Sequence, residues 1–405
     1  MKNILKVTLG ILTSIGGFLD AGAIATNASA GANFGMGLLW ATALGTLFAI
    51  FLVEMSGRLA VVSKHTLADA MREHFGFRYH AIPLATELLV DFLVLTAEIG
   101  GACIALQFVT GIPFKWFALP VGLCIWVTIW IGSFGRIEKA TAFIGLITIC
   151  FIVGAFRLRP DMHAIASGFV PHQPPQDAAH YWFLSVSIIG AIITPYVFYF
   201  YSSGAIEEKW DFKDLGVNRA VAALGMTFGC IIAMGITVVA AQTLQRAGIA
   251  VDRFEQAPLM LTDPFGRWGV FLFAASLAIC CFGAAIEVAL AVAYVVGQAF
   301  GWRWGEDLSP KDNARFAMTY TIFILLAALV TFTGIDPLKV TMFSMAMAVV
   351  ILPLVILPLL VIMNDEKYLK EQRNGWISNT VGVAAVVAAI ILAIVAIPLE
   401  IIGGG

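Results

Sequence analysis

The stretch Gly16-Gly17-Phe18-Leu19-Asp20-Ala21-Gly22-Ala23 places one carboxylate inside the first long apolar run of this chain. An acid within a membrane span is costly and usually marks a functional site. The neighbouring glycines favour a local break in the helix, and such a break frees backbone carbonyls to join the carboxylate around a cation. The stretch therefore predicts a broken first helix with an ion site at the break.

Composition assigns the rest of the chain to the membrane as well. The 405 residues are 60% hydrophobic and 12% charged, with a mean hydropathy of +0.91. These values exclude an ordinary soluble domain, and the net charge of −2 argues against a nucleic-acid partner. The six cysteines lie in apolar runs without a CxxC pair, so we expect neither disulfides nor a zinc site. We expect no cofactor.

Apolar runs of about 20 residues are long enough to cross a bilayer. About eleven such runs predict a single all-α polytopic membrane domain over residues 1–405. The runs are 7–31, 36–61, 81–110, 116–135, 138–157, 182–206, 216–244, 268–299, 314–333, 338–363 and 376–402.

The basic residues predict the orientation. If the N-terminus is in the cytoplasm, inner segments hold about 17 Lys and Arg residues and outer segments about 7. This distribution agrees with the positive-inside rule, by which cytoplasmic segments carry more Lys and Arg. We therefore expect a multi-pass protein of the cell (inner) membrane with its N-terminus cytoplasmic and its C-terminus outside. The lipid bilayer and a small ion are the partners expected, and the oligomeric state stays open.

A second interruption lies in the sixth run, in Ala191-Ile192-Ile193-Thr194-Pro195-Tyr196. Proline removes a helical hydrogen bond and clashes with the preceding turn. The two breaks are an odd number of spans apart, which predicts inverted repeats, one over about 7–157 and one over about 182–363, with an extra helix at 376–402. Prolines also kink many membrane helices that bind nothing, and that alternative remains open for Pro195 alone.

Residues 20–40 resemble the first-helix signature of the Nramp divalent-metal transporters, in which Asp-Pro-Gly-Asn is followed by Ala-Gly-Ala-x-Phe-Gly and Leu-Leu-Trp. The resemblance continues in order through Ser56-Gly57-Arg58-Leu59, residues 68–74, Ala97-Glu98-Ile99-Gly100, the sixth-span proline and Leu352-Pro353. It implies a LeuT-like fold of inverted five-helix repeats with broken helices 1 and 6. The Thr-Pro-Tyr break is also similar to the Nramp-related magnesium transporters.

Several family ligands are replaced in this chain. Alanines stand for the proline and asparagine of the first helix, and the sixth-helix methionine and histidine are Thr194 and Tyr196. Leu95 replaces one of two acids in the third helix, and the tenth-helix glutamines have apolar counterparts, Met345 or Ile351. By carry-over, the resemblance implies that the metal is held by the side chains of Asp20 and Thr194 and the carbonyls of Leu19 and Ala191. The expected substrate contacts are Asp20, Gly22, Ala23, Ala191, Thr194 and Tyr196.

Such a site contains only oxygen ligands. Thioethers suit soft and borderline metals, whereas carboxylates, carbonyls, hydroxyls and water suit Mg²⁺, Ca²⁺ and Mn²⁺. We therefore expect a hard divalent cation, Mg²⁺ or Mn²⁺, carried by alternating access. The open alternative is a small anion such as bicarbonate or a carboxylate, bound at the positive ends of the half-helices and by nearby hydroxyl groups. These hydroxyls belong to Tyr196, Tyr199, Tyr201, Ser202 and Ser203.

Coupling to protons would have to use carboxylates, because all six histidines lie in loops or near span ends. Glu87, Asp91 and Glu98 recur at spacings of four and seven and share one face of the third span. Together with Glu287 they are the candidates for a proton pathway. Glu54 and Glu287 equally fit structural roles as groups hydrogen-bonded across helices.

Other functional classes fit less well. The chain contains no HExxH, no GxSxG and no histidine deep in a span, so we expect no enzyme. An ion channel remains a lesser alternative, because selectivity can rest on a few carbonyls.

Overall fold

The computed structural model describes residues 19–132, 145–171, 177–306 and 308–403, and every regular element in these ranges is a helix. Nine helical segments in the same ranges are long and apolar enough to cross a membrane. They coincide with nine of the predicted spans. The other two predictions, 7–31 and 138–157, extend into residues outside the described ranges, and so does the end of the predicted span 116–135. The described parts of those two predictions are a helix from Ala21 to Phe34 and an apolar segment from Leu146 to Arg157.

The uninterrupted long helices are α3 (Leu39–Ser63), α5 (Phe77–Thr110), α6 (Ala118–Ile131), α12 (Leu215–Ala240), α14 (Trp268–Ala299), α15 (Ala314–Phe332), α16 (Pro337–Ile362) and α18 (Trp376–Gly403). The sixth predicted span is divided into α10 (Ala178–Ile192) and α11 (Pro195–Glu207). The shorter α-helices are α2 (Ala21–Phe34), α4 (Leu67–Phe75), α8 (Ile149–Arg157), α9 (Met162–Ser167), α13 (Thr262–Phe265) and α17 (Glu366–Leu369). The remaining short helical segments are 3-10 helices, except for the π-helical η4: η1 (Phe114–Phe117), η2 (Leu146–Thr148), η3 (Phe212–Asp214), η4 (Ala241–Gln245), η5 (Phe254–Leu261) and η6 (Lys370–Gln372).

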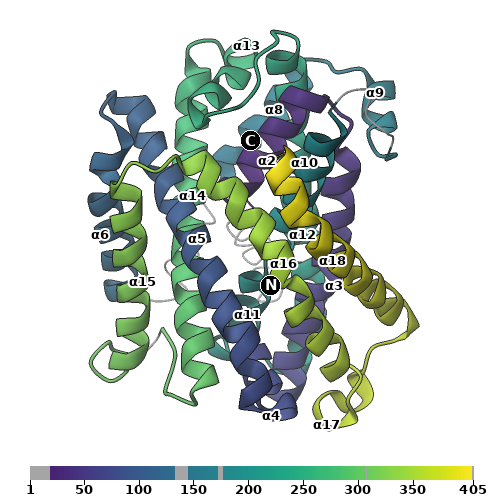
Figure 1. Cartoon of the computed structure of the whole chain (residues 1–405). Helices are drawn as coiled ribbons and strands as arrows, with labels where there is room; N and C mark the ends of the chain where they lie inside the picture. The colour runs from purple at the N-terminus through teal and green to yellow at the C-terminus, as the bar shows by residue number, and fades with distance from the viewer. Residues whose placement is uncertain (1–18, 133–144, 172–176, 307, 404–405) are drawn as a thin grey trace.

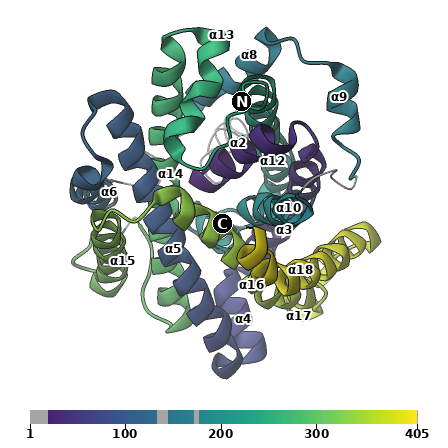
Figure 2. The same cartoon turned by 45° about the horizontal axis from the view of Figure 1, so that its top comes forward.

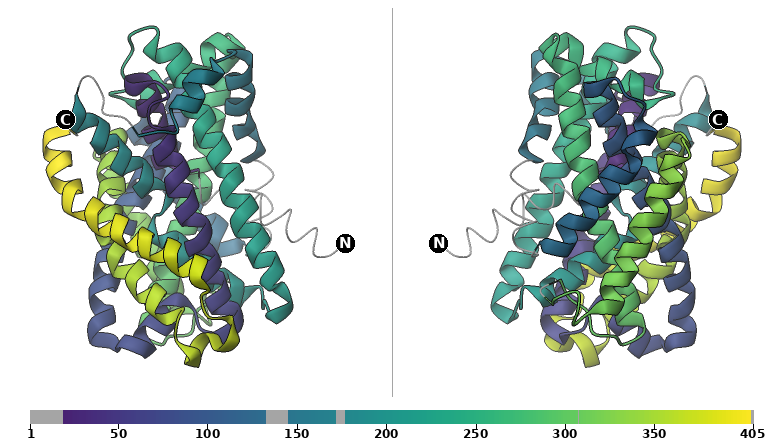
Figure 3. Two further views of the ribbon diagram at one scale, coloured as in Figure 1. Left: turned by 90° about the vertical axis from the view of Figure 1, so that its right-hand side faces the viewer. Right: turned by 90° about the vertical axis from the view of Figure 1, so that its left-hand side faces the viewer.

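The broken helices occupy the interior of the bundle. α2 packs between α10 and α12, and α11 packs against α3 and α14 (Figures 1 and 2). α5 runs along α14 on one side, with the α6 and α15 pair outside it. α18 crosses obliquely over α16 along an edge of the bundle (Figure 3).

The peripheral helices expose apolar side chains. Leu123 on α6, Leu325 on α15 and Ile394 on α18 are 59%, 52% and 69% exposed. A helix with an apolar outer face is suited to contact lipid, because its backbone polar groups are satisfied within the helix. The interior helices are buried by this outer layer, which removes the breaks from the lipid.

Three connectors between the spans contain short helices. The segment 64–80 forms α4 and the first turn of α5, the segment 158–180 contains α9, and the segment 246–266 contains η5 and α13. α4 begins where the Thr66 hydroxyl accepts from Asp69 N at 3.2 Å. Capping residues of this kind stabilise short helices that carry no long apolar run. A search for membrane spans overlooks such helices.

Candidate functional site

Only the C-terminal side of the predicted first break lies within the described residues. α2 begins at Ala21, and the preceding Asp20 is extended, with φ −114° and ψ −177°. The Asp20 Oδ1 atom accepts from Ala23 N at 2.6 Å, and the residue is 1% exposed. A carboxylate in this position offsets the positive end of the helix. The half-helix predicted before residue 19 lies outside the described residues.

A second carboxylate reaches the same helix end from α5. Both carboxylate oxygens of Glu98 accept from Ala21 N, each at 3.1 Å, and Glu98 is fully buried. The Cys281 thiol on α14 is hydrogen-bonded to Glu98 and lies close to Gly101 of α5. The third predicted span therefore supports the first break directly.

The second break is centred on Ile193 and Thr194, which leave helical geometry before α11 begins at Pro195. The Thr194 hydroxyl donates to Gly190 O at 2.8 Å and also contacts Ala191 O at 3.3 Å. Because Pro195 has no N–H, the Ala191 carbonyl lacks its usual helical donor. The predicted proline break is confirmed, and Ala191 O is a weakly engaged acceptor beside it.

The carbonyls that follow Asp20 are already engaged. Gly22 O accepts from the Thr26 hydroxyl at 2.7 Å, and Ala23 O accepts from the Asn27 amide at 2.8 Å. Asn27 Oδ1 in turn accepts from Thr42 on α3 and from Thr237 on α12, at 3.1 and 3.0 Å. This network fixes α2 against its neighbours. Of the backbone oxygens expected near a cation, those of Leu19 and Ala191 lie at the two breaks.

Tyr196 lies on the first turn of α11 and is 1% exposed. Its hydroxyl has no hydrogen-bond partner among the described residues and lies within electrostatic range of Asp20, Glu98 and Glu287. An unpaired buried hydroxyl is costly, and this one is available to a ligand placed between the breaks.

The remaining predicted acids separate into two kinds. Glu87 and Asp91 are fully buried on α5, and their carboxylate oxygens have no hydrogen-bond partner in the described part of the chain. Glu287 is half-buried on α14 and acts electrostatically on Glu98. Glu54 instead pairs with Arg58 at 3.0 Å and approaches Arg219 at 3.8 Å, an ion-pair group outside the site.

The described residues contain no group of three or more His, Cys, Asp or Glu side chains arranged to hold a metal. A cation between the breaks would therefore need backbone or neutral ligands as well. Met345 is one such neutral neighbour, which the sequence predicted only as an apolar replacement for a family glutamine. A Cβ at position 22 would lie 2.5 Å from Met345 Sδ, so the thioether lies directly against Gly22.

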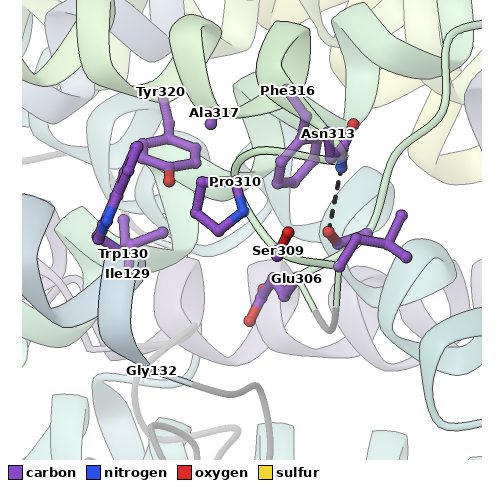
Figure 4. Close-up of a pocket in the computed structure, with 12 residues that line it drawn as sticks. Ile129, Trp130, Gly132, Glu306, Ser309, Pro310, Asn313, Phe316, Ala317 and Tyr320 are labelled. Carbon is purple, nitrogen blue, oxygen red and sulfur yellow. Dashed lines mark hydrogen bonds between the residues drawn. The ribbon is translucent and has the colours of Figure 1, made fainter.

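A separate cavity of about 220 Å³ lies where α6 ends and α15 begins (Figure 4). Trp130, Phe316 and Tyr320 line its apolar wall, and Asn313, which donates to Gly305 O at 3.2 Å, lies at its polar end. None of the predicted site residues lines this cavity.

A family model and the curated relatives point to one family. A family model described as natural resistance-associated macrophage protein-like (Nramp) matches residues 10–398. Divalent metal cation transporter MntH of Caldanaerobacter subterraneus subsp. tengcongensis is 26% identical over 378 residues, which cover 90% of this chain and 86% of that protein. The MntH of Deinococcus radiodurans is 28% identical over 374 residues, covering 85% and 78%.

Solved structures share the fold. A manganese transporter of Eremococcus coleocola has a TM-score of 0.78 at 20% identity, over 97% of this chain and 86% of its own. Mhp1, a nucleobase-cation-symport-1 family transporter, has a TM-score of 0.65 at 14% identity, over 98% and 92%. The predicted LeuT-like polytopic fold is confirmed.

Proposed function

Because this chain belongs to the Nramp family, we propose that it is a secondary transporter that carries a hard divalent cation, Mg²⁺ or Mn²⁺, by alternating access. The observation that carries this proposal is the convergence of two buried carboxylates, Asp20 and Glu98, on the start of α2. Two carboxylates that are ionised together in a dry interior require compensating charge, and a divalent cation supplies it.

The proposed ligands come from both breaks. Asp20 supplies the charged oxygen, Thr194 a hydroxyl whose lone pairs stay open while it donates to Gly190, and Leu19 and Ala191 their carbonyls. Gly22, Ala23 and Tyr196 complete the walls. Because Mg²⁺ keeps several of its waters and needs only one or two carboxylates, the set suits a partly hydrated ion.

The arrangement at α2 disfavours the anion alternative. An anion would bind the free N–H groups of a helix start. Here Ala21 N donates to Glu98 and Ala23 N donates to Asp20, so both donors are already taken by carboxylates. An anion would also face these two negative charges.

We propose that Glu87, Asp91, Glu98 and Glu287 form the route by which protons accompany the cation. Glu87 and Asp91 lie four residues apart with no partner among the described residues, so the pair is poised to bind a proton. The Glu87→Gln Asp91→Asn double variant should still bind the cation. Its uptake into proteoliposomes should no longer respond to an imposed pH gradient, and an undiminished response would exclude this pair from the route.

The cargo is tested with proteoliposomes and a panel of Mg²⁺, Mn²⁺, Ca²⁺ and bicarbonate. Wild type should show saturable cation uptake, and Asp20→Asn should lose it because the neutral amide cannot compensate a divalent ion. Asp336→Asn is a matched control, since Asp336 caps α16 at Leu338 N (2.9 Å) and asparagine caps equally well. Bicarbonate uptake that survives Asp20→Asn would overturn the cation proposal, and conduction as an ohmic current would indicate a channel.

A further inference from the structure

Met345 lies at the level of both breaks. Its thioether lies against Gly22 of α2, where a Cβ would come within 2.5 Å of Sδ and 2.7 Å of Cε. Its carbonyl lies against Gly190 of α10, where a Cβ would come within 2.5 Å of the oxygen. Glycines on both broken helices therefore admit the same residue of α16, which is fully buried.

The same two glycines adjoin the proposed ligands. Gly22 is two residues from Asp20, and Gly190 is the acceptor of the Thr194 hydroxyl at 2.8 Å. If the side chain at position 345 only filled space between the two glycines, it would need no sulfur, because leucine would pack there with a similar volume. A thioether adds a soft donor beside a carboxylate, a hydroxyl and carbonyls.

We propose that Met345 Sδ is a ligand of the transported cation and determines how well soft ions compete with hard ones. This inference rests on the proposed cation site and changes its character, because the site then contains sulfur as well as oxygen. Mn²⁺ remains acceptable to such a site, and the softer Cd²⁺ gains most from the thioether.

A second sulfur must be distinguished from the first. The Cys281 thiol is hydrogen-bonded to Glu98 and lies against Gly101 of α5, on the α14 side of the site. Cys281→Ser keeps a hydroxyl for Glu98 and removes that sulfur. Met347→Leu, a half-buried methionine on the same helix as Met345, controls for the general loss of a thioether.

The test is competition of Cd²⁺ against Mn²⁺ uptake in proteoliposomes, with X-ray absorption of bound Cd²⁺ as a direct measure of sulfur ligation. Met345→Leu should weaken Cd²⁺ competition by about tenfold or more while Mn²⁺ uptake changes much less. The Cd²⁺ sulfur signal should persist in Cys281→Ser and disappear in Met345→Leu. Met347→Leu should behave as wild type.

The outcomes separate this inference from the proposed function. Manganese uptake with an unchanged Cd²⁺ ratio in Met345→Leu would overturn the thioether ligand and leave the cation site intact. A sulfur signal that is lost in Cys281→Ser instead would assign the ligand to the thiol. Wild type that binds neither ion would reject the cation site and the thioether ligand together.

Discussion

The two helix breaks of this protein satisfy their backbones in opposite ways. At the first break, Ala21 N and Ala23 N donate to the carboxylates of Glu98 and Asp20. At the second, proline removes the donor and the Thr194 hydroxyl turns back to Gly190 O. One break therefore concentrates negative charge, and the other offers only neutral dipoles. The first should control whether a cation binds, and the second should control the geometry in which it is held.

The strongest test of this difference is Asp20→Ala. Loss of the capping carboxylate costs about 0.5–2 kcal/mol of stability, which a bundle of this size should tolerate. Loss of the charged ligand should reduce cation uptake by about 100-fold. Radioactive Mn²⁺ uptake, with size-exclusion chromatography to verify folding, measures both effects. Near-normal uptake by a folded variant would show that the charge at the first break is dispensable.

The glycines beside the breaks should also differ in their response to a methyl group. Gly190→Ala places Cβ against the backbone of Met345, which cannot move aside, and should lower the free energy of unfolding by about 1–3 kcal/mol. In Gly22→Ala the added Cβ meets the flexible end of the Met345 side chain, which can move. This variant should therefore disturb Cd²⁺ competition more than stability. Thermal unfolding in detergent compares the stability of the two variants. Equal losses of stability would contradict the expected difference between the two glycines.

Glu98→Gln tests whether the second carboxylate acts by its charge or by its hydrogen bonds. The glutamine carbonyl can still accept from Ala21 N, so α2 should keep its position. The site loses one of its two negative charges, and cation affinity should fall by about tenfold. Calorimetric titration with Mn²⁺ measures the change. Unchanged affinity would limit Glu98 to supporting the helix end.

The smallest effect is expected at the second break. Thr194→Val removes the hydroxyl bond to Gly190 O and leaves that buried carbonyl with less compensation, at a cost of about 1 kcal/mol. Uptake should fall only a few-fold, since no charge is lost, and Thr194→Ser should recover most of it. A loss as large as that of Asp20→Ala would place the dominant ligand at the second break and reverse the comparison.

Much of this architecture is determined by local properties of the sequence. Nine predicted spans match the helices closely because a run of about 20 apolar residues is recognisable without its neighbours. Pro195 identified the second break for the same reason, since its missing N–H acts within its own helix. Asp20 was recognised because a lone acid in an apolar run is anomalous wherever the chain folds.

The short helices in the connectors were not predicted from the sequence. These helices depend on caps such as Thr66 and on packing rather than on a long apolar period. Glu54 could not be distinguished from a site residue until Arg58 and Arg219 were placed beside it.

Tertiary structure decided which further groups lie beside the start of α2. Glu98 reaches Ala21 across 77 residues of sequence, and Met345 reaches Gly22 across a still longer separation. The sequence marked Met345 as a replacement for a polar residue and implied an all-oxygen site, because nothing local indicates where a thioether points. The sequence determines which helices break and where the charge lies. Only the packing of α5 and α16 against α2 decides which carboxylate and which sulfur stand beside it, since side chains on separate helices meet only when the bundle closes.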